Sequence, residues 1–152
     1  MNTAAKKHSL MISGVAVSLL LASCGGGGGG VSAESQPLIV TGVAASGAPM
    51  ANGSLQIYDK TGAAVLSSPV TIDSNGSYTA TIPATAIGPF VFEVDTGSDK
   101  VYSVLSDKSS SSVVNITPIS HLIAAKLSTT GSPFNLATEI AAGSTTVKSS
   151  DV

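Results

Sequence analysis

Seven short apolar runs, separated by turn signals, occupy the chain between Leu38 and Ile116. Runs of this length that are bounded by Gly, Pro, Asp and Asn predict the strands of an all-β sandwich. The expected strands are LIVTGVA at 38–44, SLQIY at 54–58, VTI at 70–72, SYTATI at 77–82, FVFEV at 90–94, VYSVL at 101–105 and VVNI at 113–116. The chain is therefore expected to form a Greek-key β-sandwich of about seven strands with a short α-helical C-terminal tail.

Alternation within the runs assigns side chains to the core or to solvent, because successive side chains of a strand point to opposite faces. Inward positions are expected at Leu55, Ile57, Tyr78, Ala80, Ile82, Phe90, Phe92, Val94, Val114 and Ile116. The phase of VYSVL is ambiguous. DKTG at 59–62 and DSNG at 73–76 place Asp first and Gly where a positive φ is needed, and Asn75-Gly76 is typical of a hairpin.

The first 24 residues, MNTAAKKHSLMISGVAVSLLLASC, combine two lysines with a short apolar segment at 10–22. That segment is shorter than the ~20 residues needed to cross a bilayer and fits the apolar region of a secretory signal peptide. Leu21-Ala22-Ser23-Cys24 resembles the lipobox of bacterial lipoproteins. The resemblance implies that Leu21, Ala22 and Ser23 guide cleavage and that Cys24 carries the covalent lipid; the alternative is an ordinary signal peptide with an incidental cysteine.

Location follows from the residues around this cysteine, the only one in the chain. Gly25 follows it where an aspartate would favour inner-membrane retention, so lipoprotein sorting implies the outer membrane. Gly25–Gly30 and the VSAESQ segment predict a flexible tether with a root-mean-square span of about 20 Å. The expected organisation is a signal peptide at 1–23, a tether at 24–37, a sandwich at 38–116 and a helical or disordered tail at 117–152.

VTGVAASGAPMANGSLQIYDKTGA, followed by TIDSNGSYTATIP, resembles a carboxypeptidase-regulatory-like, or transthyretin-like, β-sandwich. The family pattern has a first strand, a Gly-x-Pro turn, a small residue before the next strand, and an Asp-x-x-Gly-x-Tyr closure. The matching positions here are Gly47, Pro49, Ala51, Asp73, Gly76 and Tyr78. These positions specify turns and one core aromatic residue, and members of the family serve as accessory, adhesive or spacer modules.

The charge of the chain excludes one class of partner. All seven basic residues are lysines, and loss of Lys6 and Lys7 with a signal peptide leaves five lysines against nine acidic residues. An acidic chain without arginine has neither the basic surface nor the bidentate donors typical of nucleic-acid binding. No nucleic acid is therefore expected as a partner.

The tail begins with NITPISHLIAAKL, in which Thr117 suits a helix cap and Pro118 the first helical position. Ile119, Leu122, Ile123 and Leu127 then lie at helical spacing on one face. VNITPISHLIAA resembles a segment of bacterial lipoproteins in which a sandwich leads into a helical region. A second helical piece is expected at NLATEIAA, and because two short helices offer little to pack against, a continuation beyond Val152 is also considered.

A catalytic or metal site needs several titratable side chains close together, and this sequence offers few candidates. Asp95, Asp99 and Asp107 are candidate binding residues that could collect a calcium ion, although turn-forming roles are the preferred interpretation. Glu93 and Asp95 project from one strand face and could flank a glycosidic bond, or simply be solvated. His121 has no second histidine or thiol in the mature chain with which to complete a zinc site, so no metal, no catalytic residue and no cofactor besides the lipid are expected.

Three functions are consistent with this sequence. The first is a non-catalytic envelope module, held to the membrane by its lipid, that binds a protein or glycan partner or acts as a spacer through loops 95–100 and 106–112. The second is the N-terminal anchoring or accessory part of a larger carboxypeptidase- or hydrolase-like envelope enzyme. The third is a self-contained hydrolase that uses Glu93 and Asp95.

Overall fold

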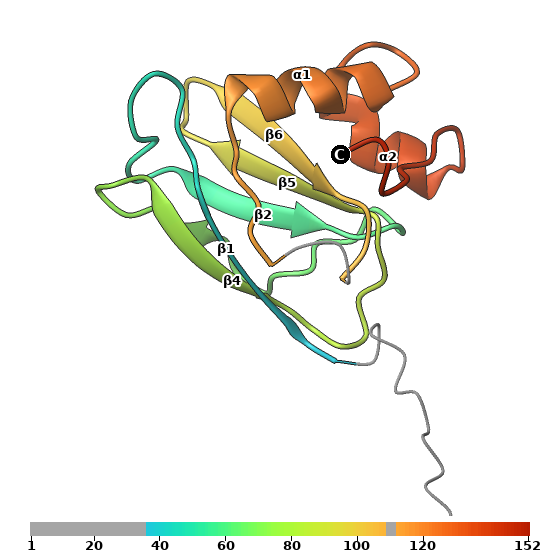
Figure 1. Cartoon of the computed structure of the whole chain (residues 1–152), viewed down its shortest axis with the longest axis horizontal. Coiled ribbons are helices and arrows are strands. Elements are labelled where there is room, and N and C mark those ends of the chain that lie inside the picture. Colours follow the sequence, from blue (N-terminus) through green and yellow to red (C-terminus); the bar gives the residue numbers. More distant parts are fainter. Residues whose placement is uncertain (1–35, 109–111) are drawn as a thin grey trace, which may run out of the picture.

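The computed structural model describes residues 36–108 and 112–152, and most of its regular structure is strand (Figure 1). Two antiparallel sheets face each other. One pairs β1 (Leu38–Val43) with β4 (Ser77–Ile82), and the other has the order β3 (Val70–Thr71), β2 (Ser54–Tyr58), β5 (Phe90–Asp95) and β6 (Lys100–Leu105). Six of the expected strands are therefore present within one or two residues of their predicted bounds.

The expected seventh strand, at 113–116, is not a regular strand. This segment runs parallel to β1 through two isolated bridges, Thr41 with Val113 and Ala44 with Ile116. Its backbone still pairs with β1: the Val114 N–H donates to the Thr41 carbonyl at 2.9 Å. The Tyr78 hydroxyl, from the neighbouring β4, donates to the Val114 carbonyl and closes the gap that Gly42 leaves between them.

The main core lies between the two sheets. All ten side chains that alternation assigns to the interior are buried there, together with Val40, Ala44, Met50, Ile72, Ala86, Val101 and Leu105. Phe90 and Phe92 are fully buried at its centre. Alternation predicts these positions because each sheet has one face turned toward the other sheet.

The turn at 73–76 does not close a hairpin. β3 pairs with β2, and β4 pairs with β1, so the turn carries the chain from one sheet to the other. The Asp73 carboxylate accepts hydrogen bonds from the Asn75 and Ser77 amides at 2.8 and 2.7 Å, as the DSNG motif predicts. The motif therefore specifies the local turn. It does not specify which strands pair on either side of the turn, and here the two flanking strands belong to different sheets.

Two helices cover part of the outer face of the four-stranded sheet (Figure 1). α1 (Pro118–Leu127) lies along β6, and α2 (Leu136–Ala141) follows a short 3₁₀ turn, η2 (Pro133–Asn135). They form a second apolar cluster made of Val91, Tyr102, Val104, Ala124, Leu136, Ile140 and Val147. The helices therefore do have a surface to pack against, and β6 is buried on both faces, which explains its ambiguous phase.

The predicted apolar stripe of α1 is not its buried face. Ile119 and Leu122 are 72% and 65% exposed, whereas Ala124 is fully buried. Thr117 and Ser120 form a capping box, and the Ser120 hydroxyl also donates to the Tyr102 carbonyl at 2.9 Å. This hydrogen bond and the small Ala124 bring the Ser120–Ala124 side of the helix onto β6. Of the predicted stripe, Leu127 packs against the second cluster, whereas Ile119, Leu122 and Ile123 remain exposed.

A buried carboxylate fixes the loop between the helices. Glu139 accepts hydrogen bonds from the Ser128 hydroxyl at 3.0 Å, the Thr129 amide at 2.9 Å and the Thr130 hydroxyl at 3.0 Å. Burial raises the pKa of Glu139, but these hydrogen bonds to the charged form outweigh that effect, so the pKa lies below its ordinary value. The loop is thus held to α2 by an ionised side chain.

Candidate functional site

A cleft of about 740 Å³ opens at the end of the sandwich opposite Leu38. Three segments that are distant in sequence meet there: the β1–β2 loop, the β5–β6 turn and the first turns of α1 (Figure 1). We call this region the cleft end and the opposite one the Leu38 end. The cleft is lined by Ser46, Ala48, Pro49, Met50, Ala51, Thr96, Asp99, Lys100, Val101, Pro118, His121 and Leu122. Its size is within the range of small-ligand and peptide side-chain pockets.

The β1–β2 loop forms the apolar wall of the cleft. A bridge between Ala45 and Pro49 closes a tight bend at Gly47, whose φ is +77°. The Met50 amide donates to the Ala44 carbonyl at 3.0 Å and fastens the bend to the end of β1. The Gly-x-Pro motif therefore places small apolar residues on a fixed loop at the rim.

The β5–β6 turn forms the polar rim. The Asp95 carboxylate accepts a hydrogen bond from the Gly97 amide at 2.7 Å, and the Thr96 hydroxyl accepts one from the Asp99 amide at 3.1 Å. Both contacts fix the turn from within. The Asp99 carboxylate accepts only a long hydrogen bond from Ser98, at 3.5 Å, among the contacts of the described residues. Asp99 thus presents a largely unused acceptor to the cleft.

His121 closes the cleft on the α1 side. Its ring centroid lies 5.9 Å from that of Tyr102 and 6.4 Å from that of Phe134, so the imidazole packs against the edge of an aromatic group. Its Nδ1 is buried, and no hydrogen-bond partner for it lies among the described residues. The side chain is therefore edge-packed, without a carboxylate to orient it as a general base.

A charged cluster adjoins the cleft on the outer face of β5 and β6. Lys100 Nζ lies 2.8 Å from Glu93 Oε1 and 3.3 Å from Asp95 Oδ2, and the Tyr102 hydroxyl donates to Glu93 Oε2 at 2.6 Å. A second hollow, of about 550 Å³, lies over Glu93, Asp95 and Tyr58. Glu93 and Asp95 share a face, as expected, and one lysine neutralises part of their charge.

The contacts within this cluster favour the charged forms of Asp95 and Lys100. The Gly97 amide, and then Lys100, lower the pKa of Asp95, while the hydrogen bond to Glu93 raises the pKa of Lys100. Burial raises the pKa values of Tyr58 and Tyr102, and Glu93 adds to both shifts. A glycosidase acid needs a raised pKa, which is opposite to the shift of Asp95. The arrangement favours ion pairing over proton transfer.

The three candidate binding aspartates are not brought together. Asp95 and Asp99 flank the β5–β6 turn at the cleft end, whereas Asp107 follows β6 at the Leu38 end, where the Ser149 hydroxyl donates to it at 3.4 Å. In the part of the chain that the structure describes, no group of three His, Cys, Asp or Glu side chains could hold a metal ion. Leu21, Ala22, Ser23 and Cys24 lie outside the described residues.

The predicted recognition loop at 95–100 contributes Asp99 and Lys100 to the cleft, but the ion pairs of Lys100 with Glu93 and Asp95 were not predicted. Leu122 was expected on the apolar stripe of α1 and not in a binding site. The signal for Lys100 was available, because the short turn after Asp95 pairs the two residues directly across the β5–β6 hairpin. Leu122 gave no such signal, since the exposed side of α1 depends on how the helix docks. Within the described ranges, no helix has the length and apolar character needed to span a bilayer.

Comparison with protein-family models, with curated proteins and with solved structures finds no match for this chain.

Proposed function

We propose that this protein is a lipoprotein of a bacterial outer membrane, anchored through Cys24, whose β-sandwich is a non-catalytic binding module. The single observation that carries the proposal is the placement of the cleft. β1 begins at Leu38, 14 residues after Cys24, and runs away from the Leu38 end toward the cleft end. An anchor at Cys24 therefore attaches the domain by the end opposite the cleft, which leaves the cleft accessible to partners.

The finer fold that we propose is a transthyretin-like Greek key. β4 returns beside β1, and β5 returns beside β2 after crossing between the sheets, which supports this connectivity. The segment at 112–116 then occupies the position of the seventh strand beside β1. The bend at Gly47 and Pro49 and the buried Tyr78 support the same assignment.

A second candidate function is the anchoring or accessory part of a larger envelope enzyme. The exposed apolar stripe of α1 favours it, because such a stripe is also a surface on which a further domain packs. The intact mass of the mature protein from its native membrane separates the two. A mass equal to residues 24–152 plus acyl chains supports the binding module, and a much larger mass supports the accessory part.

The anchor is tested by metabolic labelling with palmitate and by membrane fractionation. The wild-type chain is expected to incorporate label and to sediment with the outer membrane, and Cys24→Ser is expected to lose both properties. Ser23→Ala is the matched control, since it keeps a small residue before the cysteine. An unlabelled wild-type chain, or a Cys24→Ser variant that still carries label, would contradict the lipid anchor.

A further inference from the structure

The carboxylate of Asp99 at the cleft forms no ion pair with a described lysine. Among the described residues, Asp99 has no lysine within salt-bridge distance, and its neighbour Lys100 is already engaged by Glu93 and Asp95. The β1–β2 loop supplies a mostly apolar wall, made of Ala48, Pro49, Met50 and Ala51 together with Ser46. A ligand group with a flexible apolar stem and a positive end, such as the side chain of lysine or arginine, matches these two walls.

The exposed stripe of α1 continues the cleft. Leu122 lines the cleft and is 65% exposed, and Ile119 and Ile123 lie beside it on the outer side of the helix, 72% and 36% exposed. Contiguous exposed apolar side chains with a polar rim are characteristic of protein–protein contact surfaces. The cleft and the stripe together form one surface with an acidic end and an apolar extension.

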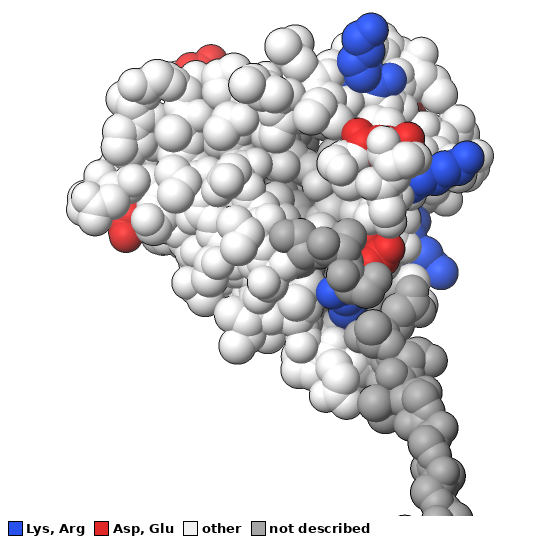
Figure 2. Space-filling view, viewed as in Figure 1, with Lys and Arg blue, Asp and Glu red and all other residues white. Residues whose placement is uncertain are grey.

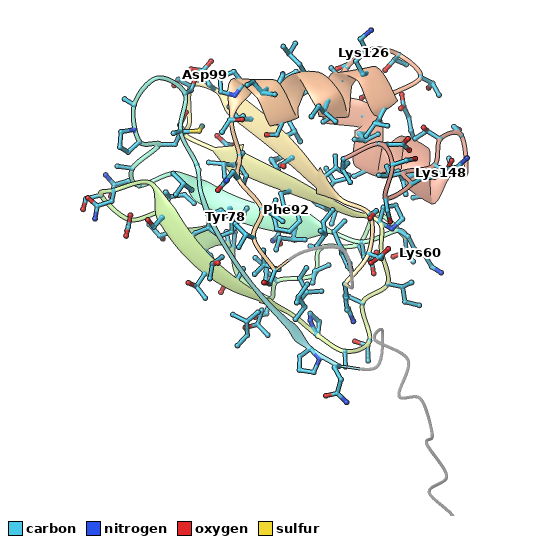
Figure 3. All side chains as sticks on the ribbon, viewed as in Figure 1. Lys60, Tyr78, Phe92, Asp99, Lys126 and Lys148 are labelled. Carbon is cyan, nitrogen blue, oxygen red and sulfur yellow. The ribbon has the colours of Figure 1, made fainter. Side chains whose placement is uncertain are left out.

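Charge is distributed unevenly along the molecule. The cleft end and the adjoining strands hold four carboxylates, of Asp73, Glu93, Asp95 and Asp99, with Lys100 as their cation among the described residues. The other described lysines lie away from the cleft: Figure 3 places Asp99 at the end of the molecule opposite Lys60, Lys126 and Lys148, and Figure 2 shows the blue groups gathered toward that other end. Of these, Lys126 borders the far end of the α1 stripe, together with Asp151. The surface around the cleft is therefore net negative.

The negative charge around the cleft favours some classes of partner over others. Two copies that met through their cleft ends would bring like charges together, which is destabilising. An anionic bilayer surface is disfavoured because the cleft end is itself net negative. A glycan would find no Phe, Tyr or Trp side chain for its rings among the residues lining the cleft. A basic amphipathic segment of a partner protein complements both the carboxylate and the apolar stripe.

We infer that the cleft end binds such a segment, with a lysine or arginine side chain in the cleft beside Asp99 and apolar side chains on Leu122 and Ile119. This inference deepens the proposed function and rests on it for the orientation of the cleft. It makes Asp99 the residue that selects positive charge. Leu122 supplies apolar contact area to the same partner.

The test uses the full chain in phosphatidylcholine vesicles and a short fluorescein-labelled peptide that carries lysine and leucine at helical spacing. Fluorescence anisotropy is read against protein-free vesicles, and a peptide with glutamate in place of lysine is the negative probe. We expect Asp99→Asn to weaken binding about two- to fivefold. Leu122→Ala is expected to weaken it about three- to tenfold.

Asp73→Asn is the matched control, because it removes the same charge from the same end outside the cleft and keeps the oxygen that accepts the turn hydrogen bonds. Unchanged binding by this variant supports a local contact with Asp99. Equal weakening by Asp73→Asn and Asp99→Asn, equal binding of the glutamate peptide, or no binding overturns the inference. Saturable binding of a soluble peptidoglycan fragment instead of the peptide also overturns it. Palmitate labelling of the same chain tests the anchor by a separate measurement, so a failure of the anchor and a failure of the contact with Asp99 can be told apart.

Discussion

Tyr102 joins several elements of the fold through different groups of one residue. Its hydroxyl donates to Glu93 on β5, its carbonyl accepts from Ser120 on α1, and its ring stacks edge-on against Phe134 of η2, with centroids 5.5 Å apart. The side chain is also part of the second apolar cluster. This position makes the hydroxyl a buried group whose protonation is coupled to stability.

We expect Tyr102→Phe to lower the free energy of unfolding by about 1–2 kcal/mol at neutral pH, because Glu93 loses a charge-assisted hydrogen bond. Burial, and then Glu93, raise the pKa of Tyr102, so its contribution is present below the unfolded value of about 10 and is lost as the pH rises above it. Urea denaturation from about pH 9 to about pH 11 should therefore show a shallower alkaline loss in Tyr102→Phe. Equal slopes would contradict this coupling.

Gly42 allows the segment at 112–116 to lie against β1. A Cβ atom at this position would lie 1.9 Å from the Val114 carbonyl oxygen, so Gly42→Ala must displace that segment. We expect a loss of about 3 kcal/mol or more in thermal or urea denaturation. Gly47→Ala is the control. Its Cβ atom would meet nothing within 4 Å, but the alanine backbone would have to adopt a φ of +77°, which costs about 1 kcal/mol. Equal losses would mean that the close approach contributes little.

At the scale of elements, the strands were predictable and the docking of the helices was not. The strand pattern comes from the face that each sheet turns toward the other, so alternation alone locates Leu55, Ile57 and Phe92 in the core. The orientation of α1 depends on a hydrogen bond to β6 and on the small Ala124, which a hydrophobic pattern does not report. The cleft was unpredictable for the same reason, since it needs the β1–β2 loop, the β5–β6 turn and α1 to meet.

The helices supply a direct test of which side of each is structural. Leu136 is fully buried in the second cluster, and we expect Leu136→Ala to lower the free energy of unfolding by about 2–4 kcal/mol. Leu122→Ala, the same substitution on the exposed stripe, should change it by less than about 0.5 kcal/mol. Chemical denaturation of both variants measures the contrast. A large loss in Leu122→Ala would show that the stripe is buried in solution.

At the scale of the molecule, the two ends of the sandwich differ in chemistry. The Leu38 end receives the chain from its N-terminal side and holds the buried Lys108, which donates to the Pro83 and Ala84 carbonyls at 2.8 Å. The cleft end carries the exposed stripe of α1 and Asp99, which forms no salt bridge with the described lysines. The end nearer the proposed anchor is thus built for internal cohesion, and the far end exposes the groups suited to a partner.

Because the helices pack on the outer face of the four-stranded sheet, we expect the sandwich and its helices to unfold as one cooperative unit. Removal of everything after Ile116 would uncover Val91, Tyr102 and Val104, which are at most 8% exposed in the folded chain. We expect this truncation to bind the apolar dye anilinonaphthalene sulfonate and to lose its sharp thermal transition, because an outer sheet face of this kind requires cover. Truncation after Ser149 is the control, since it removes only exposed residues and should melt almost as the intact chain does. A truncated sandwich that melts sharply without binding the dye would instead show that residues 117–152 are a dispensable tail, and the cleft would then lose its α1 wall without any cost to the fold.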